Sequence, residues 1–203
     1  MDTKALQNIT YGLYLLSAEE NGKDNACIIN TVCQVASNPA TISISVAKGG
    51  LTHDMIKNTN KFTVSAITQD AKFDLFKHFG LHSGRDVDKF AGRNDIARAE
   101  NGLYYLTSCA NAYISAYVTE TVDLGSHTLF IAAVTQTKVL SDSAPCTYSY
   151  YHTNIKELPK PEKTGTKGWR CVICGYVYEG ETLPEDFICP LCKHGAADFE
   201  PIE

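Results

Sequence analysis

The chain has 203 residues and a formal net charge of -5 at neutral pH, with 18 Lys and Arg against 23 Asp and Glu. No stretch of the sequence gathers basic residues into a stripe, which argues against a nucleic-acid-binding surface. No apolar run approaches the length of a membrane span, and the N-terminal apolar patch at residues 11–16 leads into Glu19 and Glu20. We therefore expect a soluble, cytoplasmic protein without nucleic-acid or membrane partners, large enough for one domain and a small appendage.

Residues up to about 150 alternate β-branched apolar segments with turns, the pattern of a β-rich domain. The expected strands are residues 26–35, 41–47, 61–67, 113–120 and 127–139. Residues 52–59 and 70–79 have helical spacing instead. This pattern predicts a mainly β fold, a barrel with short helices at its rim.

The composition changes at residues 158–168, where LPKPEKTGTKG contains almost no side chain suited to a core. We predict a flexible linker here, between a domain of residues 1–157 and a domain of residues 169–203. The last domain is too short to fold by apolar burial alone, so it needs a metal or another cross-link.

The eight cysteines fall into two groups. Four are scattered singly through the first domain, where we expect them mainly to be small buried hydrophobic residues. The other four form two Cys-x-x-Cys pairs, Cys171 with Cys174 and Cys189 with Cys192. In a reducing cytoplasm such pairs indicate metal binding more often than disulfides. Four thiolates select iron or zinc in a tetrahedral site, and the spacing alone does not choose between them.

The surroundings of the two pairs favour iron. Gly-Tyr follows the first pair at 175–176, and the second pair reads Cys-Pro-Leu-Cys. Five aromatic residues complete the pattern: Trp169, Tyr176, Tyr178, Phe187 and Phe199. These features resemble rubredoxin, and the resemblance implies one redox-active iron whose potential depends on hydrogen bonds to sulfur and on exclusion of water. A structural zinc ribbon is the alternative.

The first domain has neither a Gly-x-Gly-x-x-Gly loop nor a Walker loop, so we expect no Rossmann site and no P-loop. Its segments instead resemble the flavin-reductase-like split-barrel family, in order, over most of residues 5–152. The resemblance is carried by residues 30–39, 45–48, 51–56, 62–65, 79–80, 83–90 and 126–130. A flavin accepts a hydride and releases single electrons, which is what a one-iron centre reduced by a two-electron donor requires.

Taken with its C-terminal domain, the chain resembles the high-molecular-weight rubredoxins of anaerobes. The resemblance implies an NAD(P)H-dependent oxidoreductase with FMN in the barrel, one iron held by four cysteines, and NADH or NADPH as electron donor. It also implies a flavodiiron protein that reduces nitric oxide or dioxygen, or a similar acceptor, as partner. A homodimer with the flavin near the subunit interface is expected on the same basis.

The dianionic phosphate of FMN needs cationic or N–H-rich groups. Lys48 and Thr52 lie where a predicted strand runs into a helix N-terminus, whose N–H groups and dipole favour an anion. A second candidate phosphate or ribityl contact consists of Ser83, Gly84, Arg85 and Lys89. The basic side chains of this second group are equally expected to pair with the nearby aspartates on a solvated surface.

Four residues are candidates for the edge of the isoalloxazine ring: Asn30, Thr31, Cys33 and Gln34. The alternative is that they simply alternate along a buried strand. His127 is the candidate catalytic residue, in contact with nicotinamide or flavin, although hydrogen bonding beside Ser126 explains a histidine there as well. Ser126 and Ala132 depart from the family pattern, which places the nicotinamide pocket in question.

Two other functions stay open at this point. The chain is a passive electron carrier if a separate reductase supplies its electrons, and flavin reduction by NADH separates this hypothesis from the preferred one. It is a non-redox ligand-binding barrel if the metal is zinc. Colour separates that case, because iron-thiolate centres and flavins absorb visible light and zinc does not.

Overall fold

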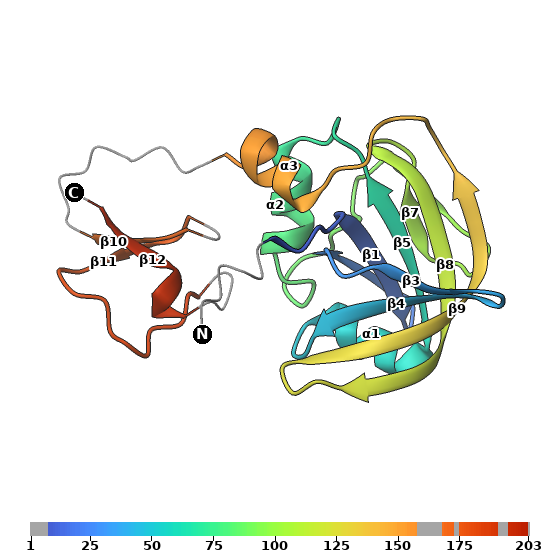
Figure 1. Ribbon diagram of the computed structural model, residues 1–203, viewed down its shortest axis with the longest axis horizontal. Coiled ribbons are helices and arrows are strands. Elements are labelled where there is room, and N and C mark those ends of the chain that lie inside the picture. Colours follow the sequence, from blue (N-terminus) through green and yellow to red (C-terminus); the bar gives the residue numbers. More distant parts are fainter. Residues whose placement is uncertain (1–7, 158–167, 173–174, 191–194, 203) are drawn as a thin grey trace. The chain divides into compact units, whose positions relative to one another are not determined.

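The computed structural model describes residues 8–157, 168–172, 175–190 and 195–202, and the chain divides into two compact units, Met1–Lys156 and Glu157–Glu203 (Figure 1). Each unit is described by itself. The predicted linker lies outside the described residues except for Gly168, which begins a strand of the second unit. No helix in the described part of the chain is long and apolar enough to cross a membrane.

The first unit is built on one seven-stranded sheet with strand order β2-β1-β5-β8-β9-β4-β3, in which every neighbouring pair is antiparallel. Its strands are β1 (Tyr14–Glu20), β2 (Lys23–Ile29), β3 (Cys33–Ser37), β4 (Ala40–Ala47), β5 (Lys61–Ile67), β8 (Ala110–Asp123) and β9 (His127–Val139). A separate hairpin consists of β6 (Ile96–Arg98) and β7 (Tyr104–Leu106). The long strands β8 and β9 curve strongly (Figure 1), so the unit is a mainly β fold wrapped around its own core.

Two helices interrupt the strand sequence. Helix α1 (Leu51–Thr59) connects β4 to β5, and it ends where Asn60 takes a left-handed conformation and donates its N–H to the Ile56 carbonyl. Helix α2 (Phe73–Leu81) follows β5. A short α3 (Tyr148–Tyr150) continues into a π-helical turn, Tyr151–Ile155, at the end of the unit.

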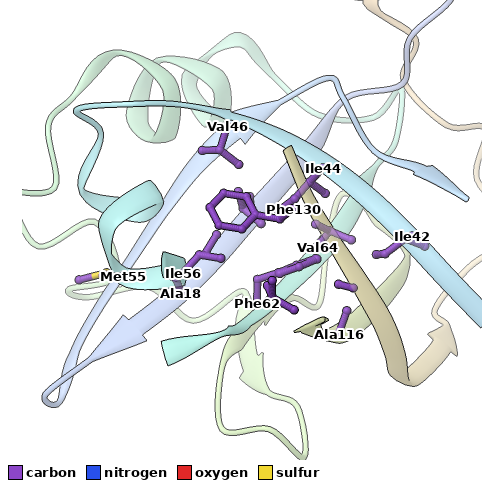
Figure 2. Packing of buried hydrophobic residues seen from close by; sticks show 13 residues of the cluster. Ala18, Ile42, Ile44, Val46, Met55, Ile56, Phe62, Val64, Ala116 and Phe130 are labelled. Atoms are coloured by element: carbon purple, nitrogen blue, oxygen red, sulfur yellow. The ribbon is translucent and has the colours of Figure 1, made fainter. Parts of the chain in front are cut away.

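The main core lies between the curved sheet and α1. Met55 and Ile56 of α1 belong to the same buried cluster as Phe130 of β9 and Phe62 of β5 (Figure 2). Strand β4 contributes every second residue to this cluster, Ile42, Ile44 and Val46, as expected for a strand with one face toward a core. Because α1 packs against the inner, core-facing side of the curved sheet, its first turn is held in a fixed place relative to the ends of β4 and β9.

The structure confirms some expected elements and corrects others. Strands at residues 61–67 and 127–139 have the expected bounds. The single strand expected at 26–35 is wrong, because β2 ends at Ile29 and β3 begins at Cys33. The chain leaves the strand conformation between β2 and β3. There the Thr31 hydroxyl donates to the Ser45 carbonyl and accepts from the Ser45 N–H.

Strand β1 was not expected from the sequence. Leu15, Leu16, Ser17 and Ala18 are all buried in succession, because β1 lies between β2 and β5 and is covered on both faces. Such a strand shows no alternation of apolar and polar residues. The helix expected at 70–79 is present, but it begins at Phe73 and ends at Leu81.

The second unit is a three-stranded antiparallel sheet with strand order β11-β10-β12. Its elements are β10 (Gly168–Cys171), β11 (Val177–Glu179), a 3-10 turn at Ala196–Asp198 and β12 (Phe199–Ile202). Cys171, Cys189 and Phe199 are buried together in its small core. The aromatic residues expected from the sequence, Trp169, Tyr176, Tyr178 and Phe187, pack around these three residues.

Replacing Phe130 by Ala should destabilise the first unit by about 3–5 kcal/mol, because the ring is fully buried and its removal leaves a cavity beside α1. Denaturant unfolding followed by near-ultraviolet circular dichroism measures this loss. The control Val139→Ala, at a side chain 74% exposed on the same strand, should change stability by no more than about 0.5 kcal/mol. Equal effects of the two substitutions would show that the core is assigned wrongly.

Candidate functional site

The pairing of β4 with β9 brings the end of β4 and the start of β9 to the same edge of the sheet, meaning the side on which these strands end and not an outer strand. Ala47, the last residue of β4, lies opposite His127, the first residue of β9. The next residue, Lys48, donates its N–H to the Ser126 carbonyl at 3.0 Å. Helix α1 begins shortly afterwards at Leu51. This edge therefore combines a basic side chain, a histidine and a helix N-terminus.

The N-terminus of α1 is open to an anion. Gly50 is its N-cap residue and has no side chain that could accept a hydrogen bond from the first-turn N–H groups. The helix dipole adds positive potential at the same place. Thr52, in the first turn, is buried, and its Oγ1 accepts a hydrogen bond from Asn25 Nδ2 at 2.9 Å.

A loop that follows α2 reaches this helix N-terminus. We call residues 83–90 the strap. Arg85 on the strap donates from Nη2 to Asp54 Oδ2 of α1 at 2.7 Å and contacts the Gly49 carbonyl at 3.5 Å. Ser83 stabilises the turn by accepting at Oγ from the Arg85 N–H and at its carbonyl from the N–H of Asp86. The two phosphate-contact groups expected separately from the sequence thus lie together, and Arg85 pairs with Asp54 rather than with its neighbour Asp86.

The strap lies directly on β2 at Gly84. Gly84 is buried, and a Cβ at this position would lie 2.0 Å from Asn25 Oδ1 and 2.4 Å from Asn25 Cγ. Only glycine fits this contact without movement of Asn25. Asn25 Oδ1 is itself buried and has no hydrogen-bond partner among the described residues. The uncapped helix N-terminus, with the strap packed closely against β2 beside it, is a feature that suits a bound phosphate.

Charged groups at this edge are held in pairs. The hydrogen bond from His53 and the Arg85 guanidinium lower the pKa of Asp54, so this group is a carboxylate at neutral pH. His53 is buried, with Nδ1 at 3.0 Å from Asp54 Oδ1 and Nε2 at 2.9 Å from Thr128 Oγ1. Lys48 forms a second pair with Asp123 at 2.6 Å, and its ammonium lowers the pKa of that carboxyl.

Lys89 lies in a different environment from the other basic candidates. Its side chain is buried, and Nζ donates to the carbonyls of Ala26 and Phe79, each at 2.8 Å. Burial lowers the pKa of this lysine. The side chain of Lys89 thus points from the strap into the protein, while the side chain of Arg85 is exposed at the helix N-terminus.

The ring-edge candidates lie further along β4. Asn30 and Thr31 are half-buried between β2 and β3, and the Thr31 hydroxyl contacts the backbone of Ser45. From Ser45 to Lys48 the chain advances about 10 Å along the strand direction. Cys33 and Gln34 begin the edge strand β3, and both are exposed. The four candidates therefore form a group separate from the phosphate end.

His127 and Tyr14 lie near the two groups of candidate residues just described. His127 is half-buried, with Nδ1 at 2.9 Å from Ser126 Oγ, and lies at the Lys48 end rather than beside Cys33. Tyr14 is a residue that the sequence reasoning missed. Tyr14 of β1 lies opposite Ile29, the residue before Asn30, and burial raises the pKa of its phenol.

Sequence reasoning also missed Asn25, His53 and Asp54. Asn25 and His53 are polar residues with less than a tenth of their surface exposed. A polar residue inside an apolar strand, and the His-Asp pair at a helix start, were the available signals. Their roles depend on contacts between β2, α1 and β9 that no local pattern indicates.

The second unit holds part of the expected metal site. Cys171 and Cys189 are both buried in the aromatic cluster, while Cys174 and Cys192 lie outside the described residues. Gly175 takes a left-handed conformation with φ 81° and donates its N–H to the Cys171 carbonyl at 2.8 Å. Buried thiolates in an aromatic shell suit a soft metal ion shielded from water.

Comparison with known proteins gives the family. Residues 6–159 match the flavin reductase like domain, and residues 169–200 match the rubrerythrin, rubredoxin-like domain. The chain belongs to the flavin reductase-like family. The flavin and the iron expected from the sequence are the cofactors that these two kinds of domain imply, and the expected fold class is confirmed.

Individual relatives agree with this assignment. The chain is 39% identical to the high molecular weight rubredoxin of Moorella thermoacetica, with all of both chains covered. It is 34% identical to the ferric-chelate reductase (NAD(P)H) of Archaeoglobus fulgidus, over 82% of this chain and 96% of that one. The NADH:FAD oxidoreductase SgcE6 of Streptomyces globisporus has a similar fold, with a TM-score of 0.65, 20% identity, and coverage of 74% of this chain and 92% of that chain.

Replacing Gly84 by Ala should weaken flavin binding at least about tenfold, because the new methyl group must displace the Asn25 amide that supports Thr52. Fluorescence titration of flavin-free protein with FMN measures the affinity. The matched control is Gly80→Ala, where the nearest atom to a Cβ would be Ile28 Cγ1 at an ordinary 3.6 Å. Unchanged affinity in Gly84→Ala would exclude this surface from the flavin site.

Proposed function

We propose that this flavin-linked oxidoreductase takes electrons from NADH or NADPH onto FMN and delivers them singly, through a rubredoxin-type iron, to a protein acceptor. The observation that carries the flavin part is the meeting of the uncapped α1 N-terminus with the strap at one edge of the barrel. When bound, FMN supplies the conversion between a two-electron donor and a one-electron acceptor. The two family matches support the pairing of flavin and iron in one chain.

The phosphate end is formed by α1 and the strap. First-turn N–H groups and the Thr52 hydroxyl supply neutral donors, and Arg85 and Lys48 supply positive charge. Ser83 and the Gly84 backbone complete the contact from the strap. Both cations pair with exposed carboxylates, and such surface pairs are weak, so a phosphate dianion can compete for them.

The ring end lies along β4 and the start of β3. We propose that Asn30, Thr31, Cys33 and Gln34 line the isoalloxazine edge. Thr31 is held in place by both of its hydrogen bonds to Ser45, which makes this end rigid. His127 lies at the other end of β4, beside Lys48, where it is proposed to contact the flavin or the nicotinamide, and its hydrogen bond with Ser126 sets the orientation of its ring.

In the second unit, Cys171, Cys174, Cys189 and Cys192 are proposed to hold one iron. The Phe187 ring lies 4.7 Å from Tyr178 and 5.3 Å from Phe199, centroid to centroid, so that apolar surface surrounds the buried sulfurs. Burial of Cys171 and Cys189 in this packing shields two of the proposed ligands from water, which supports electron transfer rather than ligand exchange as the function of the site. We propose residues 158–168 as the linker between the flavin domain, 1–157, and the rubredoxin domain, 169–203.

The proposed acceptor is a flavodiiron protein that reduces nitric oxide or dioxygen. In residues 169–203 Asp and Glu strongly outnumber Lys and Arg, so an acceptor with a basic docking surface fits best. We further propose a homodimer of the chain in the cytoplasm. Tyr117, Val122 and Leu124, on β8 and its following turn, are exposed apolar side chains that a second copy would cover.

Replacing Cys171 by Ser should abolish the visible iron-thiolate absorption and electron delivery to a rubredoxin-dependent acceptor, while NADH still bleaches the flavin band. Each cysteine is one of only four proposed ligands, and the residues proposed to bind the flavin all belong to the first unit. Anaerobic rapid-mixing spectroscopy at the flavin and iron bands measures both steps. Cys109→Ser, a half-buried cysteine of the barrel, is the control.

Three results would contradict parts of the proposal. If NADH and NADPH both fail to reduce the flavin in the wild-type protein, the chain is a passive carrier. If metal analysis finds zinc, or if the cofactor released by acid is FAD rather than FMN, the corresponding cofactor assignment is wrong.

A further inference from the structure

The strap is attached to the rest of the molecule by an unusual group, a buried ammonium. Lys89 Nζ has two backbone acceptors, the Ala26 carbonyl of β2 and the Phe79 carbonyl of α2, both at 2.8 Å. Phe79 lies in the last turn of α2, where carbonyls have no donor within the helix. The lysine thus satisfies an acceptor of the helix end and an acceptor of the strand at once.

Other contacts hold the same end of the strap. His78 Nε2 lies 2.7 Å from the Lys89 carbonyl, to which it donates. The neighbouring Phe90 is buried, with its ring centroid 5.5 Å from Phe79 and 4.7 Å from Tyr104. The C-terminal end of the strap is therefore anchored through side chain, main chain and core.

The position of the Lys89 ammonium on β2 shows which part of the strap it holds. Ala26, which accepts from Lys89, directly follows Asn25, on which Gly84 rests. The strap is thereby fixed to two consecutive residues of β2. Between these two points lies the turn that carries Arg85, whose own contacts to Asp54 and Gly49 are exposed and weak.

We propose that Lys89 is a positioning residue rather than a phosphate ligand. Its buried ammonium fixes the strap on β2, so that Gly84 and Arg85 face the N-terminus of α1 before the flavin binds. The role in flavin binding rests on the proposed function, whereas the role in ordering the strap does not. Two of the three N–H donors of Lys89 point to backbone carbonyls of the buried residues Ala26 and Phe79, so the ammonium faces β2 and the end of α2 and is poorly placed to reach a phosphate as well.

The first test uses flavin-free protein and hydrogen exchange of the strap amides. Lys89→Met removes both donors and leaves two carbonyls unpaired, so amides of residues 85–87 should exchange at least about tenfold faster, with the amides of β8 unchanged. Lys89→Arg keeps the charge and donors and should restore most of the protection. Lys138→Met, at an exposed lysine of β9, makes the same change of net charge and should have no effect on the strap.

His78→Phe is a milder variant, because it removes only the bond to the Lys89 carbonyl. It should accelerate exchange of the strap in the same direction by a smaller factor, and it decides the question if Lys89→Met does not fold. Strap exchange that equals the wild-type rate in the folded variants would overturn the proposal.

The second test is a double-mutant cycle on FMN affinity. Lys89→Met alone should weaken binding about tenfold, but in an Arg85→Gln background by a clearly smaller factor, because part of its effect acts through the guanidinium that the strap positions. Losses that multiply would make Lys89 an independent ligand and overturn the proposal. If wild-type protein binds no FMN, the proposed function fails, and the exchange experiment still decides how the strap is held.

Discussion

The antiparallel pairing of β4 with β9 is the constraint on which the site depends. It places Ala47 opposite His127 and leaves Lys48 bonded to Ser126 at the edge of the sheet. Because α1 then turns into the barrel and buries Met55 among the strands, its open N-terminus must face that edge. The strap, residues 83–90, completes the site from outside the barrel.

The site is arranged so that its charges are compensated when no anion is bound. Arg85 pairs with Asp54 and Lys48 with Asp123, and all four side chains are more than a third exposed to solvent. The groups that determine geometry are instead buried, namely Asn25 and His53. A rigid, buried frame that carries loosely paired surface cations is a suitable arrangement for reversible binding of a phosphate dianion.

Sequence patterns were sufficient where a strand or helix has one face toward the core. The bounds of β5 and β9, the presence of α1 and α2, and the aromatic shell of the second unit were all expected. The patterns failed where tertiary contacts decide: β1 is buried on both faces, and Thr31 breaks the strand expected at 26–35. They also indicated two separate phosphate contacts, because the Arg85–Asp54 pair joins segments that are distant in sequence.

The central claim is that the α1 N-terminus and the strap bind the phosphate of the flavin. Calorimetric titration of flavin-free protein with FMN and with riboflavin, which lacks the phosphate, tests it most directly. Charge-assisted hydrogen bonds contribute about 1.5–3 kcal/mol each, so FMN should bind at least about tenfold tighter than riboflavin. In Arg85→Gln this difference should become smaller, while riboflavin affinity stays the same. Equal affinities of the wild-type protein for FMN and riboflavin would contradict the account.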